Sequence, residues 1–181
     1  MRRIGFVFWM MASSTLAAEP PVDPFAFRGV KLPVSVETWQ ARLPYFTCEP
    51  YPDPRIADVS CVVDGENENT IYAGHYGTIE AHAFGGTVGF VSFVDWDCNA
   101  GKAVDLLSVL DRRLGKRAGT QVDGILESPW WKRGSTEVRF KRGIDRNGNL
   151  RFCSVTYQTD GFQAESARRQ KADPEARGKG M

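Results

Sequence analysis

The chain lacks the short motifs that mark the common enzyme classes. Its 181 residues contain no G-x-S-x-G nucleophile elbow, no glycine-rich phosphate-binding loop and no H-E-x-x-H zinc motif. Histidine is scarce, because only His75 and His82 are present. These absences argue against the best-known serine hydrolases, nucleotide enzymes and zinc proteases, and we expect no cofactor.

The chain also lacks an excess of charge of either sign. It has 23 Lys and Arg against 22 Asp and Glu, which gives a net charge of +1. Proteins that bind nucleic acid normally carry a basic excess, so we do not expect a nucleic-acid partner. Hydrophobic residues make up 42% of the chain, which is enough for one domain with its own core.

Apolar runs long enough to cross a membrane, about 20 residues, are missing. The apolar run Ile4–Met11 is short and lies between the basic pair Arg2-Arg3 and the small residues of Ala12–Ala18. This order is typical of a cleavable secretory signal, so we predict a signal peptide over residues 1–18, with an uncleaved anchor as the alternative. The signal predicts export to a bacterial periplasm or the extracellular space, as a soluble protein without a transmembrane segment after cleavage. The short signal and the lack of an N-x-[ST] acceptor favour the periplasm.

Four cysteines fit this destination, since an even number in an exported protein indicates disulfides. Of the three possible pairings we favour two bonds. Cys48–Cys61 would close a short loop, and Cys98–Cys153 would tie the central strand to the last one. A zinc site formed by all four cysteines is the alternative, although the usual C-x2-C spacing is absent.

The stretch 86–115 has the most regular patterns, a long strand followed by a helix. We expect the strand to place Val88, Phe90, Val94 and Trp96 on one face. We expect Asn99 to cap the helix, Gly115 to end it, and its apolar face to consist of Val104, Leu107, Leu110 and Leu114. A shorter helix is predicted over 36–43, capped by Ser35.

Glycine-containing turns before this strand predict a β-meander. Segments 71–76 and 79–84 flank Gly77-Thr78, and Gly85-Gly86 forms the next turn. This register places His75 opposite Glu80. It predicts a core face of Tyr72, Tyr76, Ile79, Ala81, Ala83, Val88, Phe90, Val94 and Trp96. The opposite, mixed face would carry Ile71, Ala73, His75, Glu80, His82, Phe84, Thr87, Gly89, Val91, Phe93 and Asp95.

The C-terminal part predicts two further hairpins. One joins 129–133 to 136–142 around Gly134-Ser135. The other turns at Asn147-Gly148, the strongest hairpin signal in the chain. Its register pairs three sets of residues: Val138 with Tyr157, Phe140 with Val155, and Arg142 with Cys153.

These patterns together predict an α+β fold: an antiparallel β-meander sheet with two helices packed on one face, stabilised by disulfides. We place this single domain at residues 28–162. It follows a proline-rich lead-in over 19–27 and precedes a disordered polar tail over 163–181, with room for a turn or two of helix before Pro174. The order of helix, strands, helix, strands suggests a loose duplication without a repeat at the residue level.

The best candidate catalytic or metal-binding residues are His75, Glu80 and His82, with Asp95 as a further candidate. Two imidazoles and a carboxylate are ligand types that zinc accepts, so a metal-assisted hydrolase is one hypothesis. The alternative that we favour is a cross-strand ion pair between His75 and Glu80, with His82 as a surface histidine. The same mixed sheet face, with Val91 and Phe93, is a candidate binding surface.

Charge is distributed unevenly along the chain. Residues 49–68 carry six acids and one base, whereas residues 132–151 carry seven bases and two acids. Two tryptophans precede the basic hairpin, and neighbours in a strand point to opposite faces, so one of them can be exposed. The candidate binding residues here are Trp130, Trp131, Lys132, Arg133, Arg139 and Lys141.

The sequence therefore favours a binding or inhibitory module over an enzyme. Its expected partner is an unknown protein or an anionic component of the cell envelope, because opposite charges on two parts of one small domain favour an oriented encounter. The alternatives are the metal-assisted hydrolase and a structural protein of the envelope.

Overall fold

The computed structural model describes residues 23–65, 67–123, 126–145 and 148–172. The predicted signal peptide, the first part of the lead-in, the turn residue Asn147 and residues 173–181 lie outside the described residues. Within the described part, no helix is long and apolar enough to span a membrane. Phe25 and Phe27, at the end of the expected lead-in, belong to the hydrophobic core.

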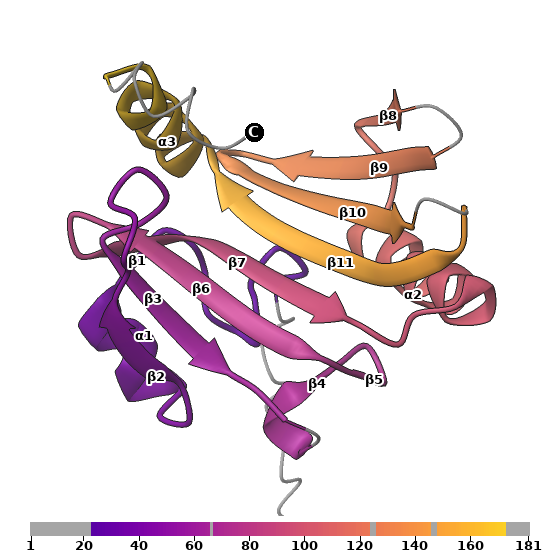
Figure 1. Ribbon diagram of the computed structural model, residues 1–181, viewed down its shortest axis with the longest axis horizontal. Coiled ribbons are helices and arrows are strands. Elements are labelled where there is room, and N and C mark those ends of the chain that lie inside the picture. Colours follow the sequence, from indigo (N-terminus) through magenta and orange to yellow (C-terminus); the bar gives the residue numbers. More distant parts are fainter. Residues whose placement is uncertain (1–22, 66, 124–125, 146–147, 173–181) are drawn as a thin grey trace, which may run out of the picture.

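One large antiparallel sheet dominates the molecule, in the strand order β2-β3-β6-β7-β11-β10-β9-β8, with β1 beside β7 (Figure 1). Its strands are β1 (Val34–Ser35), β2 (Thr47–Pro50), β3 (Val59–Val63), β6 (Thr78–Phe84), β7 (Thr87–Asp95), β8 (Gly119–Asp123), β9 (Leu126–Arg133), β10 (Thr136–Ile144) and β11 (Leu150–Thr159). The helices are α1 (Val36–Arg42), α2 (Ala100–Leu114) and α3 (Asp160–Ala172), with a 3₁₀ turn at Glu68–Thr70. A separate small hairpin consists of β4 (Ile71–Tyr72) and β5 (His75–Tyr76).

The large sheet is built from two halves of the same topology. In the first half α1 is followed by the meander β2-β3-β6-β7, and in the second half α2 is followed by β8-β9-β10-β11. The last strands of the two halves pair antiparallel at the centre, from Cys153 opposite Asp95 to Gln158 opposite Phe90. The order of elements in the sequence thus corresponds to a duplicated arrangement in space.

Both predicted helices begin where a polar side chain caps them. Ser35 Oγ accepts a hydrogen bond from the Thr38 amide (3.2 Å), and Asn99 Oδ1 accepts one from the Lys102 amide (3.0 Å). Gly115 ends α2 with a φ of +79°, as expected.

The buried face of α2 differs from the prediction by one position at its start. Its buried residues are Ala103, Leu106, Leu110 and Leu114, whereas Val104 is 67% exposed. Two neighbouring faces of this helix have apolar residues at spacings of three and four, and both faces contain Leu110 and Leu114. The sequence pattern therefore does not distinguish them.

The hydrophobic core lies on one face of the sheet, beneath α1 and α2. One row of residues crosses the sheet on this face: Trp131, Val138, Tyr157, Val91, Ala81 and Cys61. All six side chains are fully buried. The register predicted for the second C-terminal hairpin is confirmed, and so is its buried face.

Both predicted disulfides are present. Cys48–Cys61 joins directly opposed residues of β2 and β3. Cys98–Cys153 ties the segment before α2 to β11 across a sequence separation of 55 residues. The α+β, disulfide-stabilised architecture is therefore as expected, with the sheet as its larger part.

The predicted pairing of 71–76 with 79–84 is wrong. Segment 71–76 folds back on itself around Ala73-Gly74, where both residues have positive φ, and β6 pairs instead with β3 and β7. Gly77 does not form a hairpin turn. It lies so close to β7 that a Cβ there would collide with the Val94 carbonyl.

The predicted faces of β7 are wrong beyond Val88, because the strand contains a bulge. Ala83 pairs with Val88, but His82 pairs with Phe90, so Gly89 is an extra residue in β7. After the bulge the alternation is reversed. Val91 and Phe93 are fully buried, whereas Phe90, Val94 and Trp96 turn to the opposite face.

Part of the expected disordered tail is the helix α3. Only Phe162 of this helix is buried, and it stacks on Phe84 and Phe90 with ring centroids 4.6 Å and 5.6 Å apart. These rings lie on the face opposite the core, so α3 covers one end of that face (Figure 1). A helix with one apolar anchor has little periodicity, which is why the sequence pattern did not indicate it.

Candidate functional site

The face of the sheet opposite the core is the largest candidate surface, and we call it the open face. Within the described residues α1 and α2 lie on the other side, and α3 reaches only one end. Two rows cross this face through directly paired residues. The first row is Trp130, Arg139, Thr156, Ser92, Glu80, Val62 and Thr47. The second row is Lys132, Glu137, Gln158, Phe90, His82, Ser60 and Glu49.

Charge on the open face is polarised between the two halves. Among the described side chains of these strands, the β9–β10 end carries Lys132, Arg139 and Lys141 with one acid, Glu137, whereas the β2–β3–β6 end carries Glu49 and Glu80. Aromatic and small polar side chains separate the two ends. Three bases of the basic segment and Glu49 of the acidic segment therefore lie on one surface.

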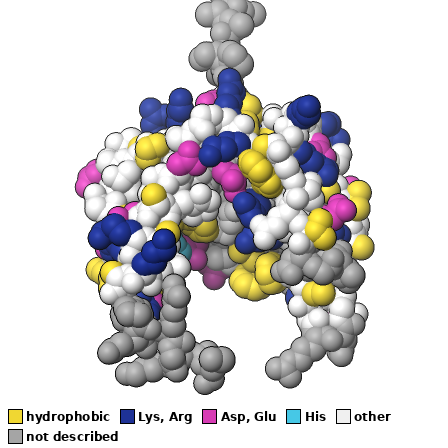
Figure 2. Space-filling view, turned by 90° about the horizontal axis from the view of Figure 1, so that it is seen from above, with side chains coloured by type: hydrophobic (Ala, Val, Ile, Leu, Met, Phe, Trp, Pro, Cys, Tyr) yellow, Lys and Arg dark blue, Asp and Glu magenta, His cyan; other side chains and the backbone are white. Residues whose placement is uncertain are grey.

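The predicted basic hairpin is partly neutralised by its own neighbours. Lys132 Nζ lies 2.8 Å from Asp160, and Arg139 pairs with Glu137 at 2.8 Å. Arg133 lies 3.5 Å from Asp23. On the face shown in Figure 2, lysine and arginine side chains are interspersed with acidic ones.

The two tryptophans point to opposite faces, as predicted. Trp131 is fully buried and donates a hydrogen bond from Nε1 to the Gly115 carbonyl at 3.1 Å. Trp130 lies on the open face, partly exposed, where a Cβ on the paired Gly119 would lie only 2.6 Å from its Nε1. Trp130 is thus the member of the pair that a partner could contact.

His82, Glu80 and Ser60 form a compact cluster on the open face. Glu80 Oε1 lies 2.7 Å from His82 Nε2 and accepts a hydrogen bond from Ser60 Oγ at 2.8 Å. The hydrogen bond with His82, and then that from Ser60, lower the pKa of Glu80 despite its partial burial. The carboxylate lies between the hydroxyl and the imidazole, so the imidazole cannot take the serine proton directly, as a nucleophilic triad requires.

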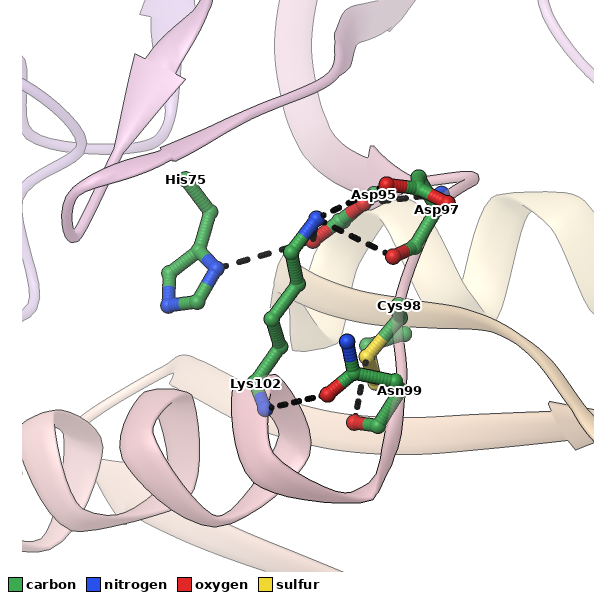
Figure 3. The surroundings of a disulfide bond; sticks show 7 residues. His75, Asp95, Asp97, Cys98, Asn99 and Lys102 are labelled. Atoms are coloured by element: carbon green, nitrogen blue, oxygen red, sulfur yellow. Dashed lines mark hydrogen bonds and ion pairs between the residues drawn. A yellow bond between two sulfur atoms is a disulfide. The ribbon is translucent and has the colours of Figure 1, made fainter.

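His75 lies elsewhere, in a cleft at the end of β7 (Figure 3). Its Nδ1 is 3.6 Å from Asp95 Oδ2. Lys102, from the first turn of α2, reaches the same carboxylate at 3.9 Å and Asp97 Oδ2 at 3.2 Å. Asp95 is buried, whereas Asp97 is exposed.

The expected cluster of His75, Glu80 and His82 does not form. The corrected strand pairing sends His75 to Asp95 and leaves Glu80 with His82. Among the described residues, no group of three or more His, Cys, Asp or Glu side chains could hold a metal ion. Val91 and Phe93, predicted for the mixed face, are core residues.

An apolar groove lies beside α3. It has a volume of about 510 Å³ and is lined by Pro33, Phe84, Thr87, Gly89, Phe162 and Arg169, among others. The Arg169 guanidinium already forms a bidentate pair with Asp58, at 2.6 Å and 3.2 Å. It is therefore not a free cation for a ligand in the groove. The sequence did not indicate this groove, since it depends on α3.

Comparison with known proteins gives no family. No family model matches the chain, and neither the curated proteins nor the solved structures contain a significant match. Inference about function therefore depends on the geometry alone.

Proposed function

We propose that the chain is an exported, non-catalytic binding module that holds a partner protein against the open face. The observation that carries this proposal is the uncovered sheet surface to which both halves contribute. A sheet face that no other element covers, with aromatic rings among polar side chains, is typical of a protein interface. An inhibitory role would follow if the partner is an enzyme whose active site this face covers.

The charges on the open face favour a partner whose own surface has an acidic end and a basic end. Lys141 is exposed at one end of the open face, where Lys132 is paired with Asp160, and Glu49 is exposed at the other end. A partner that presents acidic side chains toward β9–β10 and basic ones toward β2–β3 would be attracted and oriented at once. An anionic envelope component would meet only the basic end, so it uses less of the surface.

Export is part of this proposal. Two disulfides are typical of exported proteins, and none of the cysteines is free. We place the chain in a bacterial periplasm or outside the cell.

The proposal is tested by site-specific photo-crosslinking of the full chain in the cells that produce it. A benzophenone amino acid replaces Thr156, at the centre of the open face, and in a matched control replaces the exposed Asp105 on α2. We expect one discrete protein adduct from position 156 and none from position 105. Adducts of equal yield at both positions, or none at position 156, would contradict the proposal.

A further inference from the structure

The cleft around His75 has the size of a small-molecule site, with a polar lining. Its volume is about 340 Å³, within the roughly 300–1,000 Å³ usual for ligand pockets. Five parts of the chain meet there: the turn after β3, the β4–β5 hairpin, the start of β6, the end of β7 and the first turn of α2. The lining side chains are Asp64, His75, Tyr76, Thr78, Asp95, Trp96, Asp97 and Lys102.

Asp95 lines this cleft and has a buried carboxylate oxygen without a hydrogen-bond donor. The residue is 2% exposed, and its Oδ1 accepts a hydrogen bond from the Asp97 amide at 2.9 Å. Its Oδ2 has no hydrogen-bond donor among the described residues, since the His75 and Lys102 nitrogens remain 3.6 Å and 3.9 Å away. A buried carboxylate oxygen without a donor is costly, so a donor supplied by a ligand would be favoured.

Two exposed aromatic rings line the same cleft. Trp96 is 65% exposed and Tyr76 is 51% exposed. The Trp96 ring is nevertheless held in place, because its Nε1 donates to Thr78 Oγ1 at 3.3 Å and its ring lies 5.6 Å from that of Phe152. A fixed, exposed ring offers a flat apolar surface to a ligand at little cost in conformational entropy.

We infer that this cleft binds the ring of a neutral sugar. Lys102 Nζ donates to the Asp97 carbonyl at 3.0 Å and to its carboxylate at 3.2 Å, which leaves one N–H for a ligand. Asp95 Oδ2 can accept a hydrogen bond from a ligand hydroxyl that displaces His75 or Lys102 slightly. A hydroxyl group both donates and accepts, so it matches this pair. A sugar ring also has an apolar C–H face that can stack on Trp96. Asp64, Asp95 and Asp97 outnumber Lys102, so an anionic sugar would be repelled.

Saturation-transfer NMR on the full chain tests this inference, with N-acetylglucosamine, galactose and mannose as neutral probes. Glucuronic acid serves as the anionic probe and cadaverine as the cationic one. We expect at least one neutral sugar to bind, and its affinity to fall at least about tenfold in Asp95→Asn and in Trp96→Ala. Val122→Ala removes an exposed apolar side chain far from the cleft on β8, so binding should be unchanged in this control.

Asp95→Asn keeps the size of the side chain and an oxygen for the Asp97 amide, and Trp96 is exposed, so both variants should fold. Failure of all three neutral sugars to bind the folded wild-type chain would overturn the inference. Binding of cadaverine alone, or sugar binding that neither variant weakens, would also overturn it. The inference does not depend on the open face, since a cross-link from position 156 is expected to persist in Asp95→Asn.

Discussion

Gly89 in β7 and Phe162 in α3 are in such close contact that no side chain fits between them. A Cβ on Gly89 would lie 2.8 Å from the Phe162 Cβ and 2.9 Å from Thr159 Oγ1. The contact explains why the bulge in β7 falls at a glycine and how a helix with one buried residue is held on the sheet. The same contact fixes the position at which α3 begins to cover the open face.

Gly89→Ala should therefore destabilise the chain by about 1–3 kcal/mol, because α3 or β7 must shift to admit the methyl group. Gly161→Ala is the matched control. The Cβ of Gly161 would meet nothing within 4 Å, and alanine is favoured over glycine in a helix by about 0.5–1 kcal/mol. Urea unfolding of the two variants measures the difference. Equal stability of both would contradict the proposed contact.

The ion pair between Asp58 and Arg169 should make the docking of α3 depend on pH. The Arg169 guanidinium, and then the Gly85 amide, lower the pKa of Asp58 from its usual 3.8. Because the folded pKa is below the unfolded one, the pair stabilises the docked helix above about pH 4, and this contribution is lost as the pH falls through the folded value.

Hydrogen exchange of the α3 amides measures this effect between pH 5 and pH 2. We expect protection of α3 relative to the sheet to decrease over this range, and the decrease to be smaller in Arg169→Gln. It should not vanish, because Arg168 also lowers the pKa of Glu165, to about 2. An equally steep decrease in Arg169→Gln would show that another group is responsible. Arg168→Gln is a suitable control, because Arg168 pairs with Glu165 within the helix and not with Asp58. The Asp58–Arg169 pair therefore stays intact in this variant.

The two disulfides should contribute unequally to stability. In the loop-entropy description, closing 55 residues is worth about 4 kcal/mol and closing 13 residues about 3 kcal/mol. Replacing Cys98 and Cys153 together by alanine should therefore lower the free energy of unfolding more than replacing Cys48 and Cys61. Denaturation of the two double variants without reductant tests the order, and the reverse order would contradict it.

The buried hydroxyls of Tyr72 and Tyr157 share a hydrogen bond of 2.7 Å. Burial is the main reason that the pKa of both residues is raised. Tyr72→Phe should cost about 1–2 kcal/mol, because it leaves the other hydroxyl without this partner. The double variant with Tyr157→Phe should cost less than the sum of the two single changes, and strict additivity in a double-mutant cycle would argue against the bond.

Local signals predicted the second half of the fold well. The alternation in β10 and β11 gave a correct register through the paired residues Val138 and Tyr157, and two capping side chains marked the helix starts. The predicted bond between the central strand and the last one, Cys98–Cys153, is also correct. In these segments the local sequence pattern and the tertiary packing favour the same structure.

The first half and the candidate site could be predicted less well. Gly77-Thr78 has the composition of a turn, but its backbone is needed for close contact with β7, and the bulge at Gly89 reverses every later side chain of that strand. The bulge moves Trp96 from the expected core to the surface. The pairing of β4 with β5 separates His75 from Glu80. The cleft around Asp95 depends on these long-range contacts, which no local pattern contains.

The most direct measurement is the Kd of the partner captured through position 156, determined for wild type, Lys141→Glu and Lys171→Glu. Both variants change the net charge equally, but Lys141 is exposed on the open face and Lys171 lies at the end of α3. We predict that Lys141→Glu weakens binding about tenfold, with a reduced dependence on salt, while Lys171→Glu leaves the Kd within about twofold. Equal weakening in both variants, or none in Lys141→Glu, would contradict recognition through the open face.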